Sequence, residues 1–209
     1  MTWLPGAESR WKSRVSRSAL TPEKRSDMLK LILSGVGGQG IITAGVILGE
    51  AVVIHEGRYA VQTQSYGAEV RGGLARTDLT IANSEIYYPR VEQAHVLVAL
   101  HQDAYLRLNR SIRPGGILIV DETLVTLDAR VDARQFSLPI IRTAEEELKR
   151  PQAANMCMVG VLVTMTGVVE PDSVSQAIRT RFGVDHPNLE AFARGLELAP
   201  GRVLQSSLV

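Results

Sequence analysis

The chain has 209 residues, of which 45% are hydrophobic and 5% aromatic, and its 23 basic and 22 acidic residues leave a formal net charge of +1. This balance gives no reason to expect a nucleic-acid or membrane partner, and a chain of this length can fold without cross-links. The single cysteine, Cys157, excludes a disulfide framework or a multi-thiolate metal or iron–sulfur site within the chain. No apolar stretch is long enough for a bilayer and no secretory leader is recognisable, so we expect a soluble, cytoplasmic protein.

The first 27 residues differ from the rest of the chain. Six basic residues are interleaved with serines and few apolar neighbours, a composition typical of a solvated arm. Trp3 and Trp11 support a second interpretation, in which the arm is anchored on a partner subunit. We therefore predict a basic N-terminal arm over residues 1–27 and one domain over residues 28–209.

From Leu29 onward, short apolar strands alternate with helices. Strands are expected at residues 29–34, 59–65, 76–82, 85–88, 95–100, 117–121 and 136–141, with 76–82 and 85–88 paired as a hairpin. Helices are expected at residues 39–55, 144–148, 154–166, 173–181 and 189–198. A further helix is expected after the strand at 95–100, and it ends at about residue 112. This order predicts an α/β domain, with a Rossmann-like, mostly parallel sheet and helices on both faces.

A glycine-rich turn, Gly35-Val-Gly-Gly-Gln-Gly40, joins the first strand to the first helix. Its glycines at 35, 37 and 40 match G-x-G-x-x-G, an element in which a helix N-terminus offers N–H groups to a phosphate. Gly38 and Gln39 fill the variable positions, and Gln39 places a large amide where the helix begins. The pattern alone leaves three interpretations open: tight strand-to-helix packing, contact with a phosphate or acyl carrier, and a dinucleotide site.

A dinucleotide site also needs a carboxylate at the end of the second strand, to bind the ribose hydroxyls. That strand ends in Gln62-Thr-Gln-Ser65, which supplies none. The next residues instead place polar side chains among glycines, at the carboxyl end of a strand, where open α/β sheets bind ligands. These side chains belong to Ser65, Tyr66, Glu69 and Arg71. Arg71 can bind a phosphate or carboxylate through two N–H groups, with Glu69 orienting it, or the two can form an internal clamp.

Other polar residues carry weaker signals. His95 begins an apolar strand, as a structural histidine would, whereas His101 ends that strand and can face the ligand crevice. Asp121 either caps the segment after its strand or points into the crevice. Cys157 has no nearby base, which argues against a nucleophile, and the methionines around it predict a core or a subunit interface.

Two strings together, Gly35–Gly40 and Gln64-Ser-Tyr-Gly-Ala-Glu-Val-Arg-Gly-Gly73, resemble the paired signatures of the gamma subunit of 2-oxoacid:ferredoxin oxidoreductases. Residues 88–89, 114–121 and 154–160 are similar to that family as well, so the resemblance covers about residues 29–198. Ala68 stands where the family often has proline, and the basic arm is an addition.

The resemblance implies a gamma subunit of a complex that oxidatively decarboxylates a 2-oxoacid, most closely 2-oxoglutarate, to an acyl-CoA and CO2 while reducing ferredoxin. It also implies alpha and beta subunits that bind thiamine diphosphate with Mg2+, and iron–sulfur subunits with [4Fe-4S] clusters. This chain would hold no catalytic residue, cofactor or metal of its own, and would help to form a crevice for coenzyme A. The residues expected there are Gly35, Gly37, Gly38, Gln39, Gly40, Ser65, Tyr66, Glu69 and Arg71.

Three alternatives accompany this interpretation. The first is a gamma subunit of an aromatic 2-oxoacid enzyme, such as a phenylglyoxylate or indolepyruvate oxidoreductase. The second is a stand-alone NAD(P)-dependent dehydrogenase, and the third is a purely structural subunit.

Overall fold

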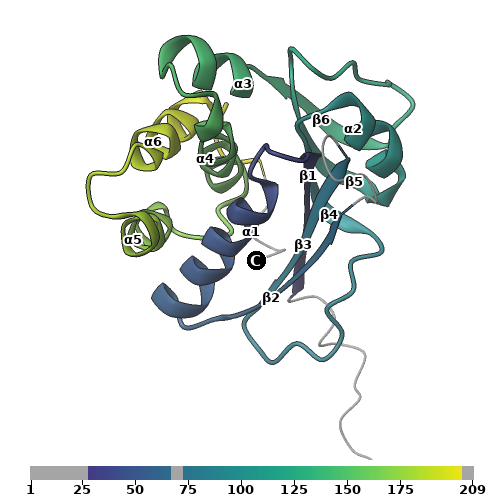
Figure 1. Ribbon diagram of the computed structural model, residues 1–209. Coiled ribbons are helices and arrows are strands. Elements are labelled where there is room, and N and C mark those ends of the chain that lie inside the picture. The colour runs from purple at the N-terminus through teal and green to yellow at the C-terminus, as the bar shows by residue number, and fades with distance from the viewer. Residues whose placement is uncertain (1–27, 67–72, 204–209) are drawn as a thin grey trace, which may run out of the picture.

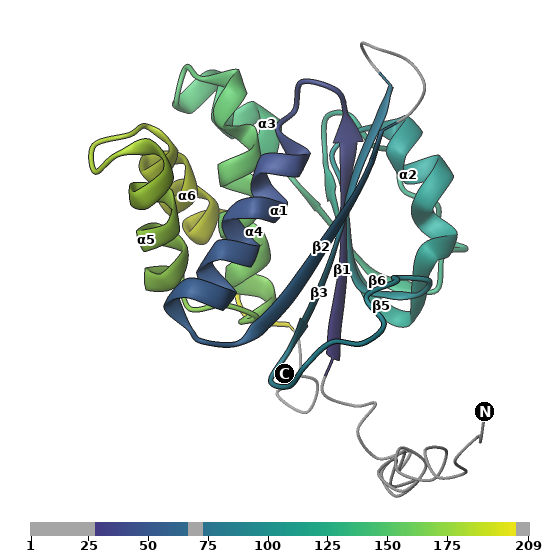
Figure 2. The same ribbon diagram turned by 60° about the horizontal axis from the view of Figure 1, so that its bottom comes forward.

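A six-stranded sheet in the order β2-β3-β1-β4-β5-β6 lies between helices on both faces (Figures 1 and 2). The computed structural model describes residues 28–66 and 73–203, except for the side chain of Tyr66. The strands are β1 (Met28–Val36), β2 (Tyr59–Tyr66), β3 (Leu74–Ala82), β4 (Ala94–Ala99), β5 (Ile112–Asp121) and β6 (Ala133–Leu138). The helices are α1 (Ile41–Glu50), α2 (Gln102–Leu108), α3 (Ile140–Arg142), α4 (Ala154–Thr166), α5 (Pro171–Phe182) and α6 (Asn188–Leu198). The predicted α/β class with helices on both faces is confirmed.

Helix α1 continues without a break into a wider π-helical segment, Ala51–His55. Gly57, at φ +65°, follows that segment and lets the chain turn into β2. A second π-helical segment, Thr143–Glu147, extends α3. Helix α1 begins at Ile41 rather than at the expected residue 39, because Gly40 is left-handed and stays outside the helix.

Strand β3 makes the sheet mixed. Strands β1, β4, β5 and β6 pair in parallel, whereas β3 is inserted between β1 and β2 and is antiparallel to both. The predicted hairpin between residues 76–82 and 85–88 is wrong. Residues 85–88 form no strand, because β1 pairs with β3 along its whole length and β2 pairs with residues 75–82 on its other side.

Each face of the sheet has its own core, as the alternation of side chains along a strand requires. On one face, Leu31, Leu33 and Val98 pack with α1, α4, α5 and α6; on the other, Ile32 and Leu97 pack with α2. Helix α4 is buried almost all round, and its methionines Met156, Met158 and Met165 are fully buried. These methionines therefore belong to the domain core and not to a subunit interface. Among the described residues, no helix has the length and apolar character needed to span a bilayer.

Candidate functional site at the carboxyl edge of the sheet

The glycine turn and the end of β2 lie at the same end of the sheet, where the carboxyl ends of β1 and β2 are found; we call this end the carboxyl edge. Strand β2 points in the same direction as β1, since both are antiparallel to β3, and Gly35 and Tyr66 are level with the same β3 residue, Ala75. The backbone N–H of Gly37 donates a hydrogen bond of 3.0 Å to the carbonyl of Gly73. The two strings singled out in the sequence therefore meet.

The backbone of the turn presents donors at the start of α1. The first helical hydrogen bond runs from the N–H of Ala44 to the carbonyl of Gly40, so the N–H groups of residues 41–43 precede the helical ladder. No side chain caps this helix start, and its first turn has no acidic residue. Gly38, at φ +96°, has open space where a Cβ would stand. This end of α1 is compatible with an anionic ligand.

The large amide that Gln39 places at the start of the helix is directed back into the protein. Its Oε1 accepts a hydrogen bond of 2.8 Å from the N–H of Val36, and its Nε2 donates one of 3.4 Å to the carbonyl of Leu100. The side chain thus closes the turn and ties it to the end of β4. A Cβ at Gly35 would overlap Oε1 of Gln39, so a larger residue there would displace the amide that closes the turn.

Gly40 has a partner that the sequence did not assign to the site. The side chain of Asn155, 6% exposed at the start of α4, donates a hydrogen bond of 3.2 Å to the carbonyl of Gly40. A Cβ on Gly40 would overlap that amide, and its φ of +68° also favours glycine. In the sequence, the role of Asn155 could have been inferred from its position, since it is a polar residue at the start of an otherwise apolar helix.

The other half of the predicted crevice is only partly described. Ser65 is exposed near the end of β2, and Tyr66, of which only the backbone is described, is the last residue of that strand. The Tyr66 side chain, Glu69 and Arg71 lie outside the described residues. Their roles stay predictions.

Asp121 and His101 act as caps. Buried Asp121 accepts hydrogen bonds from the backbone N–H groups of Thr123, Leu124 and Ile141, so it joins β5 to α3 and does not serve the crevice. The Nδ1 of His101 accepts a hydrogen bond of 3.2 Å from the N–H of Asp103 and caps α2.

Two further candidates are structural as well. Burial raises the pKa of the Cys157 thiol to about 12, so the thiol is protonated and unsuited to nucleophilic attack at neutral pH. His95 accepts a hydrogen bond of 3.0 Å at Nδ1 from the backbone N–H of Lys30, as expected of a structural histidine.

A dinucleotide site does not fit this sheet. In the Rossmann arrangement, the strand next to β1 runs parallel to it and ends in the ribose-binding carboxylate. Here that place is taken by β3, which runs the other way, so its carboxyl end lies at the opposite edge. Over residues 28–66 and 73–203, no three His, Cys, Asp or Glu side chains are grouped so as to hold a metal ion.

A hollow of about 540 Å3 lies away from the carboxyl edge, near the start of β5, where Ile112 and Pro114 form part of its wall. Its Asp128 and Arg130 pair with each other at 2.7 Å. This hollow is therefore not part of the predicted crevice.

Comparison with known proteins gives consistent matches. The family model described as pyruvate ferredoxin/flavodoxin oxidoreductase matches residues 30–198. The 2-oxoglutarate synthase subunit KorC of Methanocaldococcus jannaschii is 43% identical over 182 residues, which cover 85% of this chain and 97% of that protein.

Two other proteins extend the comparison. The ketoisovalerate oxidoreductase subunit VorA of Methanothermobacter marburgensis is 32% identical over 163 residues, which cover 77% of this chain but 33% of that protein. The crystal structure of the gamma subunit of a keto/oxoacid ferredoxin oxidoreductase from Geobacter sulfurreducens is 36% identical and superimposes with a TM-score of 0.72, covering 82% of this chain and 98% of that one. The same domain thus occurs both as a separate chain and as a third of a longer one.

Proposed function

Because the chain belongs to the pyruvate ferredoxin/flavodoxin oxidoreductase family, we propose that it is the gamma subunit of a 2-oxoglutarate:ferredoxin oxidoreductase. The complex would convert 2-oxoglutarate, CoA and oxidised ferredoxin to succinyl-CoA, CO2 and reduced ferredoxin. The higher identity to a 2-oxoglutarate synthase subunit than to a ketoisovalerate enzyme favours this substrate over other 2-oxoacids. The aromatic 2-oxoacid enzymes are not favoured over it.

The observation that carries the proposal is the junction at the carboxyl edge, where the Gly37 N–H binds the Gly73 carbonyl. It joins the two strings that carry the resemblance, so that the glycine turn and the end of β2 would form one wall of the predicted crevice. The donors at the start of α1 and the open space at Gly38 suit the phosphates of CoA.

The chain's own contribution would be binding and orientation. Thiamine diphosphate, bound by the partner subunits, supplies the carbanion chemistry of decarboxylation. The N–H groups at the start of α1 and the guanidinium of Arg71 would hold anionic groups of CoA, with Glu69 and Tyr66 orienting Arg71. Gln39 and Asn155 would not contact CoA themselves but would fix the backbone of the turn that does.

The test is an Arg71→Ala variant assembled with its partner subunits and assayed for 2-oxoglutarate-dependent, CoA-dependent reduction of ferredoxin. Loss of a charged hydrogen bond of roughly 1.5–3 kcal/mol should raise KM for CoA about tenfold or more. Arg130→Ala is the matched control, because Arg130 is an exposed arginine paired with Asp128, away from the carboxyl edge.

Unchanged KM values for CoA and 2-oxoglutarate in a fully assembled Arg71→Ala complex would contradict the role of Arg71. Failure of the wild-type chain to assemble with thiamine-binding and iron–sulfur subunits would contradict the function itself.

A further inference from the structure

Strand β2 is one of the two edge strands of the sheet, and within the described residues it pairs only with β3, in apolar surroundings. Five of the large hydrophobic side chains that are exposed lie around the edge strand β2; we call them the β2 flank, and they are Val53, Ile54, Tyr59, Tyr87 and Tyr88. Strand β2 itself reads Tyr-Ala-Val-Gln-Thr-Gln-Ser-Tyr and carries no charge. Sheet edges are usually protected by lysine, proline or a covering element, since an open edge invites strand pairing.

The β2 flank reaches both faces of the sheet. Val53 and Ile54 follow α1 and, with Ala60 and Leu79, line a hollow of about 280 Å3 beside β2. Ala60 packs toward the α1 face, so alternation turns Tyr59 to the other face. The segment with Tyr87 and Tyr88 crosses that second face.

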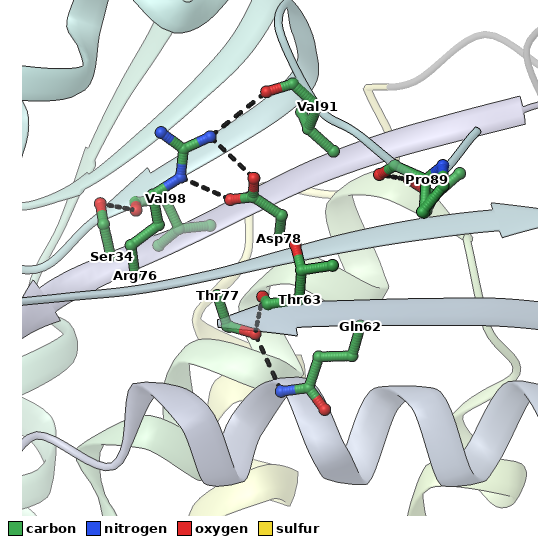
Figure 3. Close-up of polar contacts among 10 residues, drawn as sticks. Ser34, Gln62, Thr63, Arg76, Thr77, Asp78, Pro89, Val91 and Val98 are labelled. Carbon is green, nitrogen blue, oxygen red and sulfur yellow. Dashed lines mark hydrogen bonds and ion pairs between the residues drawn. The ribbon is translucent and has the colours of Figure 1, made fainter. Parts of the chain in front are cut away.

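Hydrogen bonds hold this tyrosine segment in place, as Figure 3 shows in part. The Thr80 hydroxyl donates to the carbonyl of Pro89 at 3.0 Å, and Arg76 donates to the carbonyl of Val91 at 3.3 Å while paired with Asp78. The backbone that follows the two tyrosines is thus anchored on β3 before any partner binds, which lowers the entropy that this segment loses on binding.

Two of the acidic side chains near the flank pair with arginines within the described residues. Glu56 pairs with Arg58 at 3.1 Å and Glu50 pairs with Arg181 at 2.9 Å, whereas Glu85 keeps its charge and accepts a hydrogen bond from the Tyr87 hydroxyl. A partner on this surface needs apolar side chains and an extended backbone, with little complementary charge.

A second copy of the chain does not fit this surface well. Two β2 strands related by a two-fold axis would be antiparallel. Tyr59 and Ile54, at the start of one β2, would then face the polar end of the other, at residues 63–65. An isologous contact along the full length of β2 would therefore set apolar side chains against polar ones at both of its ends.

We infer that β2 and the β2 flank are the docking surface for an extended, uncharged segment of the separate subunit that corresponds to the remaining two-thirds of VorA-like chains. This inference rests on the proposed function. Strand addition to β2 would offer about 25 Å of backbone pairing, with tyrosines as anchors. Because β2 ends at the carboxyl edge, the docked subunit would reach the candidate crevice.

The test compares two double variants of the full chain, co-expressed with that subunit. Ile54→Glu with Tyr87→Glu changes side chains that are 66% and 84% exposed in the flank; Leu106→Glu with Val184→Glu changes side chains that are 61% and 69% exposed elsewhere. We expect the flank variant to weaken subunit binding at least about tenfold and the control to leave it within about twofold. Amide hydrogen exchange of β2 should slow in the complex.

The other outcomes separate the possible failures. If the wild-type chain does not bind the subunit, the proposed function fails; if both double variants bind it equally well, only the docking surface is wrong. A wild-type chain that dimerises alone through the flank would identify a second copy as the occupant and overturn the inference. A further outcome would also overturn it: slow hydrogen exchange of the β2 amides in the isolated full chain, but fast exchange in a chain that begins at Met28. Residues 1–27 would then be the segment that covers β2.

Discussion

His95 lies at the start of β4 as a neutral hydrogen-bond acceptor, and its environment opposes protonation. Burial, followed by the charges of Arg113 and Lys30, lowers its pKa from 6.5 to about 4. The unfolded chain therefore binds a proton between pH 6.5 and 4 that the folded chain does not, so this contribution to stability is complete above pH 6.5 and lost as the pH falls toward 4.

We expect the free energy of unfolding to drop by about 1 kcal/mol between pH 7 and pH 4.5 because of His95. The drop is smaller than the full pKa shift would give, because solvent around the partly exposed ring screens its charge. In His95→Asn, the amide oxygen can accept from the Lys30 N–H but does not titrate, so the drop should shrink. Urea unfolding at the two pH values measures both. An identical pH dependence in the variant would show that His95 is not the titrating group.

Residues of the glycine turn illustrate what the sequence could and could not specify. The glycine spacing indicated a strand, a tight turn and a helix in that order, and the structure has them. The partners of the turn were not readable, because the atoms that Gln39 and Asn155 contact belong to residues 61 and 115 positions away. Only tertiary packing decides whether an amide points to a ligand or back to the protein.

At the scale of elements, α4 and α6 cross with no room between their backbones. A methyl group at Gly195 would overlap the carbonyl of Cys157, and one at Gly160 would overlap that of Phe192. Gly195→Ala should therefore destabilise the fold by about 1–3 kcal/mol, as overpacking does, despite the better helix propensity of alanine.

Gly49→Ala is the matched control for Gly195→Ala. Gly49 is also helical, but the nearest atom to its Cβ would be a Leu79 methyl group at 3.8 Å, an ordinary contact. Here the gain in helix propensity should dominate, and we expect no loss or a gain of up to about 1 kcal/mol. Urea midpoints of the two variants give the comparison. Equal effects at both sites would mean that α4 and α6 can separate at little cost.

Element order was largely predictable, and strand pairing was not. Residues 154–166 form the helix expected from their apolar run, and most of the other helices and strands lie close to their predicted bounds. The insertion of β3 between β1 and β2 was missed, because local β propensity at residues 85–88 suggested a nearer partner. The same insertion removes the ribose-binding strand end, so the fold gives a second reason, beyond the absent carboxylate, against a dinucleotide site.

At the scale of the whole molecule, the domain and the arm can be separated by experiment. The family model matches residues 30–198, which leaves residues 1–27 outside the match. The division into a domain over residues 28–209 and an arm over residues 1–27 stays a prediction, and a truncation tests it. A chain that begins at Met28 should have the same helix and strand content as the full chain, as measured by circular dichroism. Its free energy of unfolding, measured with urea, should agree with that of the full chain within about 0.5 kcal/mol. A larger loss would mean that the first 27 residues contribute to the fold.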